Sequence, residues 1–213
     1  DLLKLLDYEA EEIMEIVDLG IALKKDNKEG KTHHILKNKI IGLIFEKSST
    51  RTRVSFEAGM YQLGGYPMYL NSNDMQLGRG ESIKDTARVL SRYLDGLMIR
   101  TFEQSKVEEL AKYATIPIIN GLTDEYHPCQ ILADLMTVKE RKNKLEGLKV
   151  AFIGDGNNIA NSFIVAALKL GMKFTLACPE GYEPLDEVLE FALGNDDFRL
   201  VRDKRKAAQD ADV

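Results

Sequence analysis

A run of hydroxyl and guanidinium side chains follows the first apolar segment of the sequence. It separates the apolar residues 40–45 from a helix-like stretch that contains Phe56, and it consists of Ser48, Ser49, Thr50, Arg51, Thr52 and Arg53. Serine and threonine are ordinary caps at a helix start, so the hydroxyls alone require no ligand. Two arginines in a first helical turn, however, oppose the positive end of the helix dipole at a cost of about 0.3–1 kcal/mol. Hydroxyls, free backbone N–H groups and Arg51 together predict a bound phosphate.

Arg53 and Arg100 each have a structural alternative to a ligand contact. Glu57 lies one helical turn after Arg53, so an ion pair between them is the structural alternative for Arg53. Arg100 directly follows the apolar residues 96–99, and an arginine that closes a buried strand is either a salt-bridge partner or a ligand contact. Ligands of open parallel sheets bind at the ends of strands, so the place of Arg100 beside the first group favours an anion contact.

A third polar group consists of His127, Pro128, Cys129 and Gln130, after an apolar run that ends at Ile119. Proline is favoured at the first helical position, so we expect His127 at the N-cap and Gln130 two positions after the proline. Gln130 could then serve only as the reciprocal partner in a capping box. Histidine is a poor N-cap compared with serine, aspartate or asparagine, so His127 indicates a donor intended for a ligand.

These three groups predict electrostatic chemistry. They place cationic, hydroxyl, imidazole and amide side chains on neighbouring loops, with no serine or cysteine paired with a base as a nucleophile. An acyl phosphate held there would have its leaving group at a helix terminus and its carbonyl oxygen polarised by donors. An amine could then attack the carbonyl carbon.

The elements that would position these residues alternate along the chain. The predicted strands cover 40–45, 66–70, 97–99 and 116–119, and the predicted helices cover 9–24, 51–63, 82–93, 105–113 and 128–141. Such alternation is typical of a parallel, doubly wound sheet. The polar segment 141–147 then precedes a new strand, so we predict an α/β chain of two doubly wound parallel-sheet domains. Their boundary lies between residues 143 and 144, which gives domains 1–143 and 144–213.

The second domain is expected to be only partly present. Its predicted strands are 148–153, 172–177 and one near Leu200, its predicted helices are 158–170, one after Pro184 and one up to Ala211, and Asp212 and Val213 resemble the opening of a further strand. Gly154-x-Gly156 follows the first of these strands, but Ile159 replaces the third glycine of a dinucleotide fingerprint. Cys178-Pro179 also stands where a ribose-binding carboxylate is expected, so NAD is not predicted.

Composition and charge exclude several other classes. The formal net charge is −5, with Lys and Arg spread along the chain, which argues against a nucleic-acid surface. No apolar run approaches the roughly 20 residues that span a bilayer, and no secretory leader is evident, so we expect a cytoplasmic protein and no membrane partner. Cys129 and Cys178 lack metal-site spacing, and the adjacent His33 and His34 are expected to be solvated, so no metal is predicted.

Three strings resemble the aspartate and ornithine transcarbamoylase family. They are residues 45–53 (Phe-Glu-Lys-Ser-Ser-Thr-Arg-Thr-Arg), residues 124–130 (Asp-Glu-Tyr-His-Pro-Cys-Gln) and residues 154–158 (Gly-Asp-Gly-Asn-Asn). The Ser-Thr-Arg-Thr and His-Pro-x-Gln pair, in this order and spacing, is highly specific. The resemblance covers the whole chain, and roughly two-thirds of a two-domain family member.

The resemblance implies a site for carbamoyl phosphate and roles for individual residues. Arg51, Arg100 and His127 would be catalytic, with Thr52, Arg100 and His127 polarising the carbonyl oxygen and Gln130 accepting from the carbamoyl NH2. The residues implied in carbamoyl phosphate binding are Ser49, Thr50, Arg51, Thr52, Arg53, Gln76, Arg100, His127 and Gln130.

The resemblance also implies the acceptor and the assembly. Asn158 would contact L-ornithine, whose δ-amine would take the carbamoyl group to give citrulline and phosphate for arginine metabolism, without a metal or organic cofactor. Gln76, in a loop with Gly78 and Gly80, would reach a neighbouring subunit of a homotrimer. The family's Ser-Met-Gly and His-Cys-Leu-Pro motifs do not occur here, so putrescine or aspartate as acceptor, or an anion-binding module without catalysis, stay as alternatives.

Overall fold

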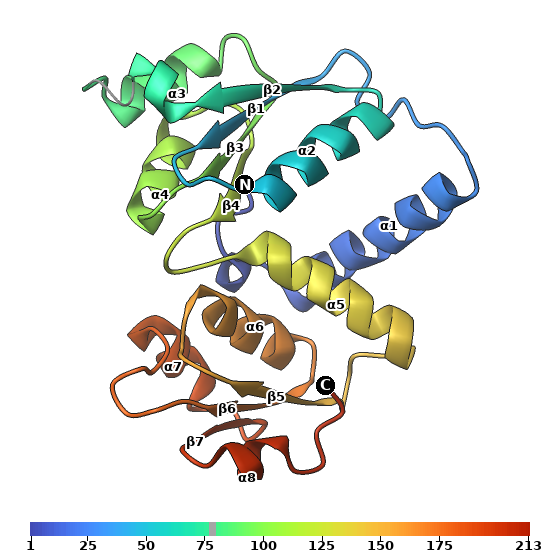
Figure 1. The fold of residues 1–213 in the computed structure, drawn as a ribbon, viewed down its shortest axis with the longest axis vertical. Coiled ribbons are helices and arrows are strands. Elements are labelled where there is room, and N and C mark those ends of the chain that lie inside the picture. The colour runs from blue at the N-terminus through green and yellow to red at the C-terminus, as the bar shows by residue number, and fades with distance from the viewer. Residues whose placement is uncertain (77–79) are drawn as a thin grey trace. The chain divides into compact units, whose positions relative to one another are not determined.

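The computed structural model describes residues 1–76 and 80–213. Its elements fall into two compact units. The first unit comprises Asp1–Leu3 and Leu23–Asp124, and the second comprises Lys4–Ala22 and Glu125–Val213 (Figure 1). Among the described residues, no helix is both long and apolar enough to cross a membrane.

A parallel sheet forms the centre of the first unit. Its strands are β1 (Ile40–Phe45), β2 (Tyr66–Asn71), β3 (Gly96–Arg100) and β4 (Ile118–Leu122). Their order is β2-β1-β3-β4, and all the pairings are parallel. The chain therefore starts in the interior of the sheet and winds outward in both directions, which confirms the predicted doubly wound architecture.

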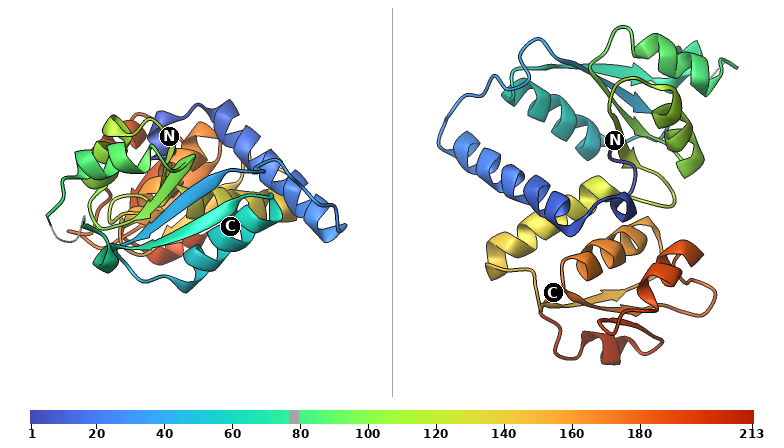
Figure 2. Two further views of the ribbon diagram at one scale, coloured as in Figure 1. Left: turned by 90° about the horizontal axis from the view of Figure 1, so that it is seen from above. Right: turned by 180° about the vertical axis from the view of Figure 1, so that it is seen from behind.

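Helices cover both faces of this sheet (Figure 2). They are α2 (Thr50–Gln62), α3 (Ile83–Leu90) and α4 (Gln104–Tyr113), with the short η2 (Ser72–Asp74) after β2. Met60 of α2 packs with Leu43 and Met98 on one face. Ala87 of α3 and Leu110 of α4 pack with strand residues on the other face. Because neighbouring strand residues point to opposite faces and both faces are covered, β1 is apolar throughout, and β3 is apolar and buried up to its last residue, Arg100.

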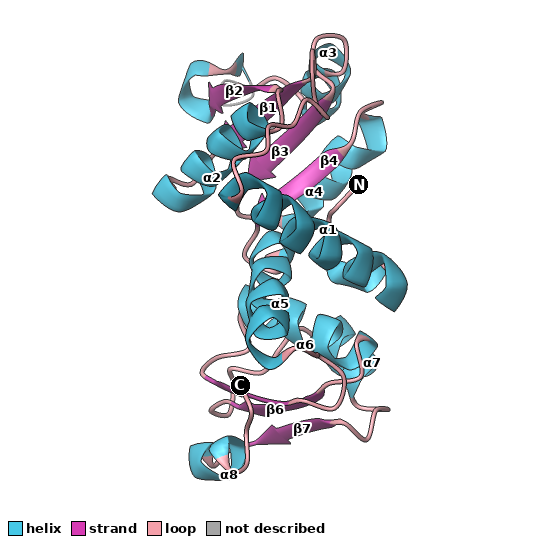
Figure 3. Cartoon of the chain, turned by 90° about the vertical axis from the view of Figure 1, so that its right-hand side faces the viewer, coloured by secondary structure: helices cyan, strands magenta, loops and turns pink. Residues whose placement is uncertain are grey.

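The second unit contains a three-stranded parallel sheet and the helices around it. Its strands are β5 (Lys149–Ile153), β6 (Lys173–Ala177) and β7 (Phe198–Val201), in the order β5-β6-β7. Its helices are η1 (Leu5–Asp7), most of α1 (Ala10–Lys28), α5 (Pro128–Lys142), α6 (Asn158–Lys169), α7 (Asp186–Ala192) and α8 (Lys204–Ala208). Helices α6 and α8 lie on opposite faces of the sheet (Figure 3). Residues 160–168 of α6 are all buried, as expected of a helix that is apolar on every side.

Two predicted elements differ in their ends. Helix α1 continues to Lys28 and does not stop near residue 24, because its lysines are good helix formers and favour the negative end of the dipole in the last turn. Strand β4 begins at Ile118 and continues to Leu122, whereas the apolar run indicated 116–119. Pro117 lacks an N–H for the strand ladder, and Asn120 and Gly121 are residue types that are depleted in strands.

The end of the chain runs beside β5. The N–H of Asp212 donates to the carbonyl of Lys149 at 2.8 Å, and the N–H of Ala151 donates to the carbonyl of Val213 at 3.0 Å. These bonds are those that the predicted opening of a further strand requires.

Candidate active site

The hydroxyl and guanidinium run opens α2 in the first unit, directly after β1. Ser49 is the N-cap, and its Oγ accepts a hydrogen bond from the backbone N–H of Thr52 at 3.2 Å. The first turn, which the structure describes in full, holds Arg51 and Arg53 and no acidic residue. The protein therefore leaves the positive end of this helix uncompensated, as an anion site requires.

Arg100 lies at the end of β3 and faces the same helix start. Its Nη1 donates to Thr52 Oγ1 at 3.3 Å, and its Nε is buried with no hydrogen-bond partner among the described residues. Burial lowers the pKa of Arg100, and the positive charge of Arg51 lowers it further. The exposed Arg51 and the partly buried Arg100 repel each other, and an anion that binds both removes this repulsion. The predicted grouping of Arg51, Thr52 and Arg100 is therefore present.

The other cations beside this group have carboxylate partners. Lys106 Nζ binds Glu46 at 2.9 Å, and Lys47 forms an ion pair with Asp124. Arg53 Nε donates to Glu57 at 2.8 Å, so the ion pair expected from their spacing is formed. Its guanidinium also lies 3.7 Å from the centre of the Tyr69 ring. Within the described part of the first unit, Arg51 and Arg100 thus differ from these neighbours in having no carboxylate partner.

Glu46 connects the ends of β1 and β3 with the start of α4, close to the anion group. Its N–H donates to the carbonyl of Arg100 at 2.9 Å, and its carboxylate accepts from the buried Thr101 hydroxyl and from Lys106 at the start of α4. No sequence pattern marked Glu46 or Lys106. Glu46 is one of two adjacent charged residues that precede the Ser-Thr-Arg-Thr string, but spacing alone could not reveal its partner 60 residues away.

Gln76 is exposed in the first unit, and its carbonyl accepts from the N–H of Glu81 at 3.1 Å. Residues 77–79 of the same loop, including Gly78, lie outside the described residues. The predicted contact of Gln76 with a neighbouring subunit stays a prediction.

His127 belongs to the second unit, where it is the N-cap of α5 with Pro128 at the first helical position, as predicted. It is nine-tenths buried, and its backbone N–H donates to Ser162 Oγ of α6 at 2.9 Å. Asn161, the neighbour of Ser162, donates to the carbonyl of Glu125 at 3.0 Å. Two buried polar residues of α6 therefore hold the segment that presents His127. Asparagine and serine inside an otherwise apolar helix were the signal that could have found them.

Gln130 does not close a capping box. The N–H of His127 that such a box would use donates to Ser162, and the side-chain amide of Gln130 donates to Asp134 Oδ1 at 2.9 Å. Because the amide nitrogen of Gln130 points to Asp134, its amide oxygen is directed away from Asp134. Burial raises the pKa of Asp134, and the Gln130 hydrogen bond opposes that change.

The two adjacent asparagines after β5 have different positions. Asn157 is the N-cap of α6, and its Oδ1 accepts from the N–H groups of Ile159 at 3.0 Å and Ala160 at 3.2 Å. Asn158 is the first helical residue and is partly buried. Since Asn157 is used to cap the helix, Asn158 keeps its place as the candidate for the acceptor contact.

Family models match nearly the whole chain. Residues 1–140 match the carbamoyl-P binding domain of aspartate/ornithine carbamoyltransferase, and residues 146–213 match the Asp/Orn binding domain. The chain belongs to this family.

Its relatives within the aspartate/ornithine carbamoyltransferase family include bacterial and archaeal proteins. An ornithine carbamoyltransferase of Oceanobacillus iheyensis is 56% identical, over 100% of this chain and 68% of the relative. One of Thermococcus kodakarensis is 51% identical, over 100% and 69%. A solved ornithine carbamoyltransferase structure from Pyrococcus furiosus is 52% identical with a TM-score of 0.95, over 100% of this chain and 69% of that chain. One from Burkholderia thailandensis has a TM-score of 0.92 at 43% identity, over 99% and 72%.

The cysteines of this carbamoyltransferase family member are not activated. Burial raises the pKa of Cys129 to about 12 and also raises the pKa of Cys178. Only about one Cys129 in 10⁵ is then a thiolate at pH 7, so we expect slow labelling by a thiol-reactive disulfide, with a rate that rises with pH. Ellman titration of the native protein, against the same protein in guanidinium, measures this. Native labelling as fast as that of the unfolded chain would contradict it.

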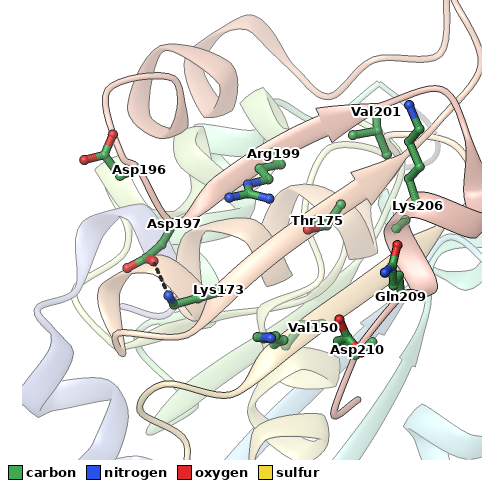
Figure 4. Close-up of a pocket in the computed structure, with 13 residues that line it drawn as sticks. Val150, Lys173, Thr175, Asp196, Asp197, Arg199, Val201, Lys206, Gln209 and Asp210 are labelled. Atoms are coloured by element: carbon green, nitrogen blue, oxygen red, sulfur yellow. Dashed lines mark ion pairs between the residues drawn. The ribbon is translucent and has the colours of Figure 1, made fainter.

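A separate cavity of about 560 Å³ lies beside α8 in the second unit (Figure 4). No predicted site residue lines it. Its charged lining residues are Lys149, Lys173, Arg199, Lys206, Asp196, Asp197 and Asp210. Lys173 and Asp197 pair at 3.7 Å, and the carboxylates nearly balance the cations, so this cavity lacks the excess positive charge that a phosphate requires.

Proposed function

We propose that this protein transfers the carbamoyl group of carbamoyl phosphate to the δ-amine of L-ornithine, giving L-citrulline and phosphate. The observation that carries the proposal is that Arg51 and Arg100 both lie at the positive end of α2, whose first turn holds no acidic residue, without a carboxylate partner among the described residues. A phosphate dianion would satisfy both cations and the first-turn N–H groups.

The donor would be held and activated without a covalent intermediate. Ser49, Thr50, Arg51 and Thr52 bind the phosphate end, with Arg53 as an outer charge and Gln76 supplied by a neighbouring subunit. Thr52, Arg100 and His127 polarise the carbonyl oxygen, and the amide oxygen of Gln130 accepts from the carbamoyl NH2. A C–N bond to the amine then replaces the C–O bond to phosphate, and the departing phosphate takes up the proton that the amine loses. Preorganised donors of this kind account for much of the rate in acyl transfer.

The acceptor side rests on Asn158 and on the relatives, which are named ornithine carbamoyltransferases. In this proposal residues 1–143 bind the donor and residues 144–213 form part of the amino-acid-binding domain. The protein would act in the cytoplasm in arginine biosynthesis as a homotrimer, with carbamoyl phosphate and ornithine as its partners. It would use no metal, organic cofactor, nucleic acid or membrane.

Calorimetry of the chain with carbamoyl phosphate, followed by an ornithine analogue, tests the proposal. We expect two binding events in that order, and citrulline formation when ornithine, aspartate and putrescine are compared as acceptors. Binding of the donor alone would make the chain an anion-binding module. Faster product formation with aspartate or putrescine would replace the acceptor, and absence of donor binding would overturn the proposal.

A further inference from the structure

Strand β4 contains one residue more than its partner β3. Ile99 pairs with Asn120 and Arg100 pairs with Leu122, so Gly121 is the extra residue of a β-bulge. A Cβ at Gly121 would lie 2.4 Å from Met98 Sδ and 3.2 Å from the carbonyl oxygen of Ile99. Met98 is fully buried, so a side chain at position 121 has little room. A side chain at this position would therefore displace the buried Met98 side chain and press on the backbone of β3.

The bulge lies within a buried polar group. Asn120 belongs to β4, and Thr123 is the first residue after the strand. Here Asn120 Nδ2 and Thr123 Oγ1 both donate to Gln104 Oε1, at 3.1 Å and 2.9 Å. Asn120 Nδ2 also donates to the carbonyl of Leu3 at 2.9 Å. All three polar residues are more than nine-tenths buried, so losing one partner would leave a buried polar atom without its hydrogen bond.

The same arrangement fixes the segment that carries Arg100. The N–H of Thr101 donates to the carbonyl of Leu122 at 3.0 Å, and the N–H of Asp124 donates to the carbonyl of Phe102 at 2.7 Å. Gln104 begins α4, four residues after Arg100. The segments that follow β3 and β4 are therefore held in register directly after the bulge.

We propose that Gly121 and Gln104, with Thr123, are positioning residues for the anion site, because the bulge and its buried amide hold Arg100 where its guanidinium meets the phosphate. The inference rests on the proposed function and adds a determinant that does not touch the substrate. It predicts that donor affinity depends on residues whose side chains face the interior.

Calorimetry with inorganic phosphate and with carbamoyl phosphate, at a temperature where each variant is folded, tests this. Gly121→Ala should raise the Kd for both by about 10- to 100-fold, as expected when a binding group is displaced by about 1 Å. Gly96→Ala is the matched control in the same sheet, because its Cβ would meet nothing closer than 3.7 Å. Its Kd should stay within about twofold of the wild-type value.

Thr123→Val gives a second, nearly isosteric test if Gly121→Ala does not fold. It should weaken phosphate binding severalfold, and Thr123→Ser, which keeps the hydroxyl, should restore it. A folded Thr123→Val or Gly121→Ala protein with wild-type Kd overturns the inference, as does a loss that Thr123→Ser fails to restore. If the wild-type chain itself does not bind carbamoyl phosphate, the proposed function fails instead.

Discussion

Arg51→Gln is expected to reduce carbamoyl transfer by about 100- to 1,000-fold, the usual loss for one preorganised donor to a transition state. Arg51 stands in the first turn of α2 and is close enough to Arg100 for its charge to lower that residue's pKa. Glutamine removes the charge and keeps most of the side-chain volume. Initial rates with saturating ornithine, together with the Kd for inorganic phosphate, measure the loss.

The same substitution should stabilise the unliganded protein. Arg51 opposes the helix dipole, so its removal should raise the free energy of unfolding by about 0.3–1 kcal/mol. Urea denaturation without ligand checks the sign. Arg92→Gln is the control, since Arg92 is an exposed arginine of the same unit away from α2. Unchanged turnover in Arg51→Gln would contradict the role assigned to Arg51. So would a loss in the free energy of unfolding equal to the loss in the free energy of phosphate binding.

Gly156→Ala is expected to lower the free energy of unfolding by about 3 kcal/mol, the upper range for an overpacked site. A Cβ at Gly156 would lie 2.2 Å from the backbone nitrogen of Pro184 and 2.4 Å from the carbonyl carbon of Glu183. Backbone atoms cannot rotate away as side chains do, so the segment before α7 must move. The N–H of Gly156 also donates to the carbonyl of Tyr182 at 2.7 Å, and this bond would be strained.

Urea denaturation of Gly156→Ala beside Gly154→Ala measures this effect. At Gly154 the nearest atom to a Cβ would be Phe152 Cε1 at 3.4 Å, an ordinary contact, so we expect a change within about 0.5 kcal/mol. Because Gly156 precedes the start of α6, its variant should also bind an ornithine analogue less tightly. Equal unfolding midpoints for the two variants would show that the loop adapts and that the close approach is not required.

The alternation of apolar runs and amphipathic stretches was sufficient to predict the parallel sheets and most of their elements. It could not predict the bulge at Gly121, because one extra residue in a strand leaves no periodic signal and depends on which strand is the neighbour. Ile159, in place of a third glycine after Gly154-x-Gly156, argued against a dinucleotide site. No sequence pattern indicated the reason why residue 156 is glycine. That reason lies in a backbone contact with residues that are 27 and 28 positions away.

The candidate site residues were predicted where residue type conflicted with local preference. Arginines in a first helical turn and a histidine at an N-cap both oppose the ordinary rules of helix ends, and this conflict marked Arg51 and His127. Glu46 was missed because it is locally unremarkable, and Ser162 because a single serine in an apolar helix does not indicate which residue it binds. Their importance comes from partners that only the folded chain brings near them.

Helix α6 begins with the acceptor candidate Asn158 and, one turn later, holds the backbone of His127 through Ser162. The proposed amino-acid contact and the residue that anchors His127 therefore belong to one helix. Under the proposed function, a substitution that tilts α6 is expected to alter both recognition of the incoming amine and polarisation of the donor. Variants along α6 should consequently show correlated changes in acceptor KM and in kcat, even when the altered residue contacts neither substrate.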